Sequence, residues 1–170
     1  MRDQITVGSM FAGIGGICLG FKQNGCKIIW ANEIDKYACR TYRLNFGDEY
    51  LVEGDIQKIN ANSIPKFDIL TAGFPCQAFS SVGLLEGFND PRGNLFFETA
   101  RVIHKVKPRV VFLENVANLV KHDDGKTFEV ILKSLEDLGY YTVYKVMNAK
   151  EYGNIPQPVS YTHLTLPTTE

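Results

Sequence analysis

Residues 69–77 are Ile-Leu-Thr-Ala-Gly-Phe-Pro-Cys-Gln, an apolar run that leads directly into a proline and a cysteine. The run is short and ends at a glycine, which is typical of a buried strand. Pro75 has a fixed φ and restricts Phe74 to an extended conformation, so we expect a stiff backbone at Cys76. Ligands of open α/β sheets bind where the strands end. The sequence therefore indicates that the Cys76 thiol faces a crevice, where it can act as a nucleophile.

Strand-like and helix-like segments alternate along the rest of the chain. We expect strands at residues 5–11, 27–32, 50–53, 69–72, 109–113 and 140–147, and helices after the first strand up to residue 24 and at residues 35–46, 94–105 and 127–138. Asp35 is expected to cap the second helix, and Gly139 to end the last one. Repeated β-α-β units predict a doubly wound, mostly parallel α/β sheet. The long connection at residues 77–92 is expected to have a functional role.

Length, composition and cysteine spacing narrow the classes of protein to which the chain can belong. The 170 residues, 45% of them hydrophobic, are enough for one domain with a sizeable core, and the net charge of −1 gives no sign of nucleic-acid binding. No apolar run is long enough to cross a membrane, and the N-terminus lacks the apolar region of a signal peptide. The four cysteines are irregularly spaced, which predicts neither a metal site nor a disulfide framework. We therefore expect a cytoplasmic protein.

A glycine-rich turn follows the first expected strand. Residues 11–16 are Phe-Ala-Gly-Ile-Gly-Gly, and Glu33 closes the second strand about 20 residues later, where a carboxylate can bind ribose hydroxyls. Cys18 occupies the third glycine position of a Gly-x-Gly-x-x-Gly pattern, so a tight structural turn remains the alternative to a nucleotide site. Asp55, after the third strand, can accept a hydrogen bond from an adenine amino group or can serve as a turn residue.

A second carboxylate follows the strongest apolar run. Glu114 comes directly after residues 110–113, so we expect it in the same crevice as Cys76. Burial there would raise its pKa and let it donate a proton; the alternative is a cap for the next turn. The remaining cysteines, Cys18, Cys26 and Cys39, are expected to be buried and inert.

In this order, these segments resemble the C5-cytosine DNA methyltransferases, especially the bacterial type II enzymes of restriction-modification systems. The turn at 11–16 resembles their cofactor motif, and residues 73–80 resemble their nucleophile motif. Residues 90–96, 114–116 and 152–157 resemble three later motifs, so the likeness covers residues 5–157, the N-terminal catalytic portion. The resemblance implies a Rossmann-like S-adenosylmethionine-dependent methyltransferase fold. It also implies a monomer of bacterial or phage origin, double-stranded DNA as partner, and a cognate restriction endonuclease as genetic partner.

The resemblance also implies roles for matching positions. Cys76 would attack C6 of a flipped-out cytosine, and Glu114 would hold the base at N3 and its amino group. The expected contacts of S-adenosylmethionine are Phe11, Gly13, Gly15, Glu33, Asp55, Ile56 and Leu95. The expected pocket for the cytosine and its DNA comprises Pro75, Gln77, Ser80, Arg92, Asn115 and Val116.

The resemblance ends after residue 157. The family continues there with an Arg-x-Arg pair, whereas residues 158–161 are Pro-Val-Ser-Tyr. Residues 162–170 show neither strand alternation nor a helical stripe, so we expect neither element there, and residues 159–164 can be reverse-translated into the transposon end used in sequencing libraries. The expected organisation is thus a partial catalytic and cofactor-binding domain at 1–157, an artefactual tail at 158–170, and no target-recognition domain. Such a fragment would be inactive.

Three alternatives remain open from the sequence. The chain could be a module that binds cofactor without catalysis. The glycine turn and Glu33 also suit a nicotinamide-dependent oxidoreductase, although that class does not explain residues 73–77. A cysteine hydrolase is the third alternative, but no motif places a histidine beside Cys76.

Overall fold

The computed structural model describes residues 4–75, 95–148, 151–153 and 160–165, the last of these as backbone only. Its described part contains one seven-stranded sheet in the order β3-β2-β1-β4-β5-β7-β6. The strands are β1 (Thr6–Met10), β2 (Lys27–Glu33), β3 (Leu51–Glu53), β4 (Ile69–Gly73), β5 (Val110–Val116), β6 (Val143–Asn148) and β7 (Ser160–Thr165). All pairs among β1 to β5 are parallel, and β7 is antiparallel to both of its neighbours. The predicted doubly wound, mostly parallel sheet is confirmed.

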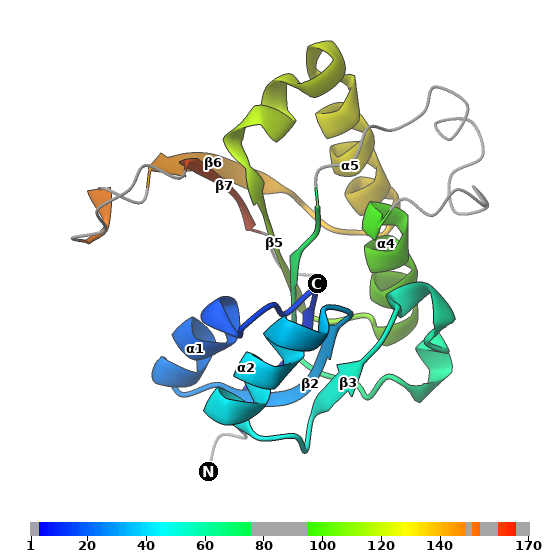
Figure 1. Cartoon of the computed structure of the whole chain (residues 1–170). Coiled ribbons are helices and arrows are strands. Elements are labelled where there is room, and N and C mark those ends of the chain that lie inside the picture. The colour runs from blue at the N-terminus through cyan, green and yellow to red at the C-terminus, as the bar shows by residue number, and fades with distance from the viewer. Residues whose placement is uncertain (1–3, 76–94, 149–150, 154–159, 166–170) are drawn as a thin grey trace.

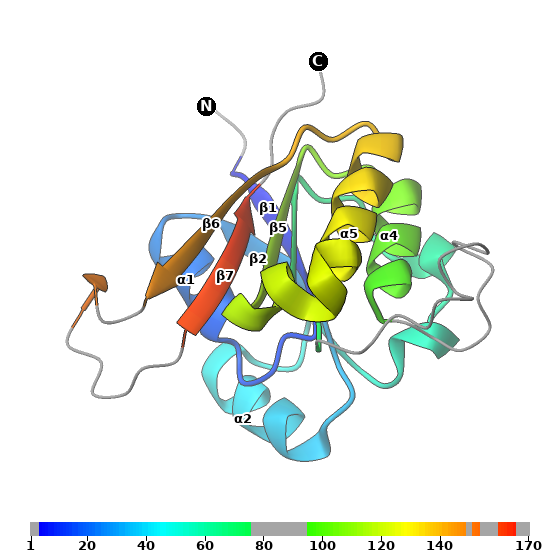
Figure 2. The ribbon, with the colours of Figure 1, turned by 90° about the horizontal axis from the view of Figure 1, so that it is seen from above.

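Helices lie on both faces of the sheet (Figures 1 and 2). One face carries α1 (Gly16–Gln23) and α2 (Lys36–Phe46), and the other carries α4 (Leu95–Val106) and α5 (Lys126–Asp137). Short 3₁₀ turns complete the described connections: η1 (Ile56–Lys58), η2 (Ala61–Ser63) and η4 (Ala117–Gly125). None of the helices in the described ranges is long and apolar enough to cross a membrane.

Local sequence signals account for the helix ends. The Asp35 carboxylate accepts hydrogen bonds from the backbone N–H groups of Tyr37 (2.9 Å) and Ala38 (2.7 Å), which caps α2 as predicted. Gly139 has a φ of 88°, the left-handed conformation that glycine adopts readily, directly after α5. Both predictions from the sequence are confirmed.

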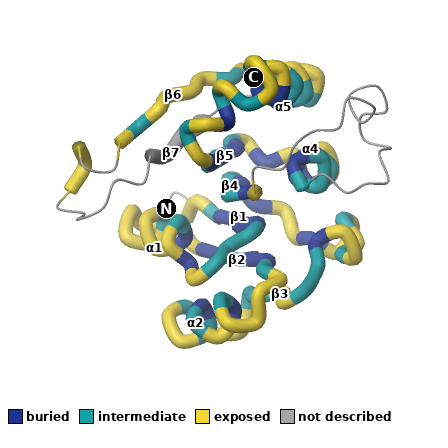
Figure 3. The backbone as a smooth tube through the Cα atoms, turned by 45° about the horizontal axis from the view of Figure 1, so that its top comes forward, coloured by how far each residue is buried: buried dark blue, intermediate teal, exposed yellow. Residues whose placement is uncertain are grey.

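The core has one part on each face of the sheet. Leu70, Leu113 and Phe96 lie in the larger part, under α4 and α5, and are fully buried. The smaller part lies between the other face and the helices α1 and α2, and includes Val7 of β1 and Tyr42 of α2. The tube in Figure 3 accordingly runs dark blue along the central strands and turns yellow on the outer surfaces of the helices. The central strands are therefore held from both sides, and the residues at their ends have fixed positions.

Two expectations about strand ends are wrong. β5 continues to Val116, so Glu114 and Asn115 lie within the strand and not in the turn after it. The tail also contains a strand, because β7 pairs with both β5 and β6. Strand pairing uses backbone N–H and C=O groups, so a segment without alternating side chains can still fill a place between two strands.

The strand order places a crevice beside β1. From β1 the chain proceeds to β2 and β3 on one side, and then returns to β4 and β5 on the other. In such sheets the connections at the carboxyl ends of the two adjacent strands diverge and leave room for a ligand. The glycine-rich turn after β1 and the Phe74-Pro75 segment after β4 therefore meet at this point.

Candidate functional site

A pocket of about 340 Å³ opens at the carboxyl ends of β1, β2, β3 and β4. Five of the residues expected to contact a cofactor line it, namely Phe11, Glu33, Asp55, Ile56 and Leu95. Pro75 lines it as well, although it was expected in the neighbouring substrate pocket. Segments distant in sequence thus converge on one cavity at the predicted edge of the sheet.

Glu33 ties two of these segments together. Its Oε2 atom accepts a hydrogen bond from the backbone N–H of Gly13 (2.8 Å), in the glycine-rich turn. Its Oε1 atom accepts from the backbone N–H groups of Ile34 and Asp35, both at 2.8 Å. A carboxylate oxygen has two lone pairs, so Oε2 can accept one further hydrogen bond from a ligand hydroxyl.

The glycines of the turn have different roles. Phe11 and Gly13 have φ values of 52° and 56°, which bring the backbone N–H of Gly13 to Glu33. Gly15 has a φ of 94°, and a Cβ atom there would overlap the ring of Phe46. Gly15 does not line the pocket. Its lack of a side chain is explained by close packing of α1 against α2.

A second wall comes from the turn after β3. Asp55 caps η1 by accepting a hydrogen bond at Oδ1 from the backbone N–H of Gln57 (3.0 Å), and Ile56 is buried beneath it. The buried Asn32 side chain donates from Nδ2 to the carbonyls of Val52 and Gly54, both at 2.9 Å. Sequence reasoning missed Asn32, although an amide at the end of the apolar β2 run is a signal that could have indicated it.

Glu114 lies next to this pocket, across Gly73. The two residues are register partners on β5 and β4, and a Cβ atom on Gly73 would lie 3.2 Å from Glu114 Oε2. Burial raises the pKa of the Glu114 carboxyl group. Among the described residues, no hydrogen bond to this carboxylate and no ion pair with it is recorded. Sequence reasoning also missed Gly73, whose missing side chain makes room for the carboxylate.

Asn115 connects β5 to the segment that leads to Cys76. Its buried side chain donates a hydrogen bond from Nδ2 to the carbonyl of Phe74 (2.7 Å) and accepts one at Oδ1 from the backbone N–H of Val116 (2.9 Å). The carbonyl of Phe74 is thus fixed two residues before the expected nucleophile. Val116 itself is exposed at the end of β5.

The remaining expected residues, Cys76, Gln77, Ser80 and Arg92, lie outside the described residues. Cys18 and Cys39 are buried as expected, and burial raises the pKa of both thiols. Cys26 is half-buried, so the expectation of a buried thiol is wrong there.

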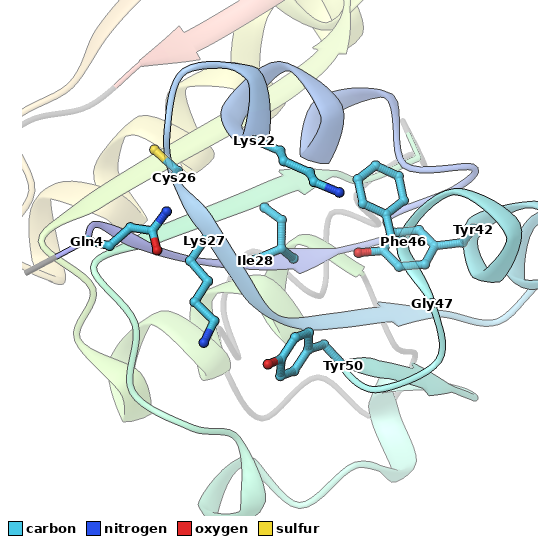
Figure 4. A pocket seen from close by; sticks show the side chains of 9 residues that line it. All are labelled: Gln4, Lys22, Cys26, Lys27, Ile28, Tyr42, Phe46, Gly47 and Tyr50. Atoms are coloured by element: carbon cyan, nitrogen blue, oxygen red, sulfur yellow. The ribbon is translucent and has the colours of Figure 1, made fainter.

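A second hollow of about 300 Å³ lies at the amino ends of β1 and β2 (Figure 4). Lys22, Lys27 and three aromatic side chains line it. Lys22 stands in the last turn of α1, where a cation offsets the negative end of the helix dipole, and its Nζ lies 5.4 Å from the centre of the Phe46 ring. This structural role explains the lysine, so the candidate site is the one at the carboxyl ends.

Comparisons with known proteins find similar sequences over most of the chain. The family model for C-5 cytosine-specific DNA methylases matches residues 5–158. The chain is 52% identical over 155 residues to the type II methyltransferase M.Bsp6I of Bacillus sp. (strain RFL6), covering 90% of this chain and 49% of that protein. It is 49% identical over 148 residues to M.HhaI of Haemophilus parahaemolyticus, covering 87% and 44%. The chain therefore spans about half the length of the curated relatives it matches.

Solved structures show the same fold. The Dnmt2 methyltransferase of S. pombe superimposes with a TM-score of 0.77 at 23% identity, over 98% of this chain and 50% of that one. A DNMT2 mutant of Spodoptera frugiperda superimposes with a TM-score of 0.78 at 21% identity, over 97% and 50%. With the family match over nearly the whole length, the chain belongs to the C-5 cytosine-specific DNA methylases.

Proposed function

We propose that residues 1–157 are the catalytic portion of an enzyme that transfers a methyl group from S-adenosylmethionine to C5 of a cytosine in double-stranded DNA. The observation that carries this proposal is the shared position of Gly73. This residue lines the pocket of Glu33 and Asp55 and is also the register partner of Glu114, whose carboxylate occupies the space beside the missing side chain. A methyl donor in the pocket and a base held by Glu114 would then be neighbours across one strand.

The pocket suits the proposed cofactor. Glu33 keeps acceptor capacity for ribose hydroxyls, and Asp55 Oδ2 accepts none of the hydrogen bonds recorded for the described residues. Ile56, Leu95 and Phe11 offer apolar surfaces for the adenine ring. When bound, S-adenosylmethionine supplies an electrophilic methyl group.

The proposed chemistry depends on two side chains. The Cys76 thiolate forms a bond to C6 of a flipped-out cytosine, and electron density moves toward C5 and N3. A protonated Glu114, favoured by its raised pKa, donates a hydrogen bond to N3 and stabilises this charge. C5 would then take the methyl group, with S-adenosylhomocysteine as the leaving group. A base would remove the C5 proton, and the electrons of that C–H bond would re-form the C5=C6 double bond as the Cys76–C6 bond breaks and the thiolate is restored. Asn115 keeps the backbone before Cys76 in place.

Further parts of the proposal concern the whole protein. The enzyme acts as a monomer in the bacterial cytoplasm, with a restriction endonuclease as genetic partner. The family match ends at residue 158, which supports a catalytic portion at 1–157 and a foreign tail beyond it. Because relatives are about twice as long, we propose that residues 1–170 bind the cofactor without completing a reaction.

Two measurements on the 170-residue chain test this proposal. Calorimetry should detect binding of S-adenosylmethionine to the chain and no binding of NAD. Glu33→Ala should weaken the affinity by about 30-fold through loss of the turn and of the ribose acceptor, whereas Glu129→Ala on the exposed face of α5 should not change it. Trapping on 5-fluorocytosine DNA should give no covalent adduct with this chain.

Each other result has a definite meaning. NAD binding without S-adenosylmethionine binding would favour an oxidoreductase and overturn the proposal. An adduct that disappears in Cys76→Ala would confirm the nucleophile and contradict the proposed inactivity of the chain.

A further inference from the structure

We propose that Arg101 is a positioning residue that holds the adenine wall of the cofactor pocket. The proposal rests on the proposed function, because it assigns a role in binding S-adenosylmethionine to a residue that does not line the pocket. Arg101 belongs to the middle of α4, whose first residue, Leu95, lines the pocket.

The Arg101 guanidinium spans the η1 turn. Nη2 donates a hydrogen bond to the carbonyl of Ile56 (2.8 Å), and Nη1 donates to the carbonyl of Ile59 (3.1 Å). These carbonyls lie at the beginning of η1 and directly after it. A single planar group thus fixes both ends of the turn that carries Ile56 and follows Asp55.

Glu98 fixes the guanidinium in turn. Glu98 lies one turn earlier on α4, and its Oε2 atom accepts from Arg101 Nε at 2.7 Å and lies 2.6 Å from Nη2. The Glu98 side chain is 20% exposed and that of Arg101 33%, so both are partly shielded from water. A lysine cannot reproduce this arrangement, because its single ammonium group cannot bind two separate carbonyls and the carboxylate in one plane.

The consequence is a fixed distance between two walls of the pocket. Leu95 on α4 forms one wall, and Asp55 with Ile56 forms another. Within η1, the turn is closed by short-range hydrogen bonds: the Asp55 side-chain cap on Gln57 N, and backbone bonds from Lys58 N to Asp55 O (2.9 Å) and from Ile59 N to Ile56 O (3.1 Å). Arg101 ties this turn to α4 by two hydrogen bonds, in addition to the apolar packing of Ile56, so its loss should let the Asp55–Ile56 wall move relative to Leu95.

Ligand affinities separate positioning from a purely structural role. We would measure binding of S-adenosylmethionine and of adenosine to the 170-residue chain by calorimetry, well below the unfolding midpoint of each variant. Arg101→Lys should lower the affinity for both ligands by the same factor, about tenfold, because the effect is confined to the adenine end of the pocket and both ligands carry adenine. The control Arg109→Lys, an exposed arginine at the amino edge of the sheet, should leave both affinities within about twofold.

A second variant keeps the test decisive if Arg101→Lys does not fold. Glu98→Gln keeps the arginine but removes the charge that holds its guanidinium in place. It should therefore lower the affinity for both ligands by about threefold. A lower unfolding midpoint with unchanged affinities would overturn the proposal and leave Arg101 a structural residue. A loss for S-adenosylmethionine but not for adenosine would also overturn it. If the wild-type chain bound neither ligand, the cofactor assignment itself would fail, and the role of Arg101 with it.

Discussion

Asp68 and Glu114 lie at opposite edges of the same sheet: the amino edge, where the parallel strands begin, and the carboxyl edge, where they end. Asp68 precedes β4 at the amino edge, where its Oδ2 atom accepts hydrogen bonds from the backbone N–H (2.9 Å) and the hydroxyl (2.8 Å) of Thr6. These bonds lower the pKa of Asp68, and Arg109 at 3.9 Å adds to the effect. Glu114 lies near the end of β5, and burial raises its pKa.

The difference shows what each edge is built for. At the amino edge, the carboxylate of Asp68 is used to join β1 to β4, so it contributes to folding. At the carboxyl edge, the carboxylates of Glu33, Asp55 and Glu114 keep acceptor or donor capacity that the described residues do not use. Unused polar groups are unfavourable for stability, and they collect where ligands bind. Three substitutions test this contrast.

The largest effect is expected for Asn115. This residue departs from the contrast, because it lies at the carboxyl edge and yet is buried with both side-chain polar atoms hydrogen-bonded. Asn115→Ala leaves the carbonyl of Phe74 without its partner and should lower the free energy of unfolding by about 2 kcal/mol. Urea denaturation measures this change, with Asn118→Ala, an exposed asparagine in η4, as control. Equal effects of the two substitutions would show that the Asn115–Phe74 bond does not stabilise the fold.

Asn115 also shows how much of the structure can be predicted from the sequence. The order of strands and helices, the Asp35 cap and the Gly139 stop are local signals, and each could be predicted from neighbouring residues. The carbonyl partners of Asn115 and Arg101 could not be predicted, because they lie 41 to 45 positions away in the sequence. A carbonyl is present in every residue and leaves no mark in the sequence. Only the folded chain shows which ones lie within reach.

The same limit explains the errors at strand ends. β5 continues through Glu114 because the backbone of Gly73 pairs with it, and β7 forms between two strands that offer backbone groups. Side-chain patterns predict a strand from its buried face, so they miss pairing that depends on neighbouring backbone alone. Glu33 and Glu114 could still be predicted as candidates near the carboxyl ends of β2 and β5, because polar residues after apolar runs are visible in the sequence.

A smaller effect is expected at the amino edge. Asp68→Asn removes the charge from the bonds to Thr6 and should lower the free energy of unfolding by about 1 kcal/mol at neutral pH, since the side chain is partly exposed. The folded pKa is below the ordinary value of about 3.9, so this stability is present above that value and is lost as the pH falls through the folded pKa. The urea midpoint of wild type should therefore exceed that of the variant at neutral pH, and the two midpoints should converge at acidic pH.

A matched control for Asp68 is Asp124→Asn. Asp124 is exposed and has a φ of 53°, a conformation that asparagine adopts equally well. It should leave the unfolding midpoint unchanged at either pH. If Asp68→Asn behaved like this control, the bonds to Thr6 would contribute nothing, and the amino edge would no longer differ from the carboxyl edge in stability.

The smallest effect, and the one of opposite sign, is expected for Glu114→Gln. The folded pKa of Glu114 lies above the ordinary value of about 4.3, so wild type loses stability as the pH rises from that value through the folded pKa. Glutamine carries no charge and avoids this loss, so the variant should be more stable than wild type at neutral pH, by less than about 1 kcal/mol. The two proteins should unfold at similar urea concentrations at acidic pH, where both side chains are neutral. A variant less stable than wild type at neutral pH would mean that the Glu114 carboxylate supports the fold as the Asp68 carboxylate does. The contrast between the two edges would then fail at the residue that we propose binds the cytosine base.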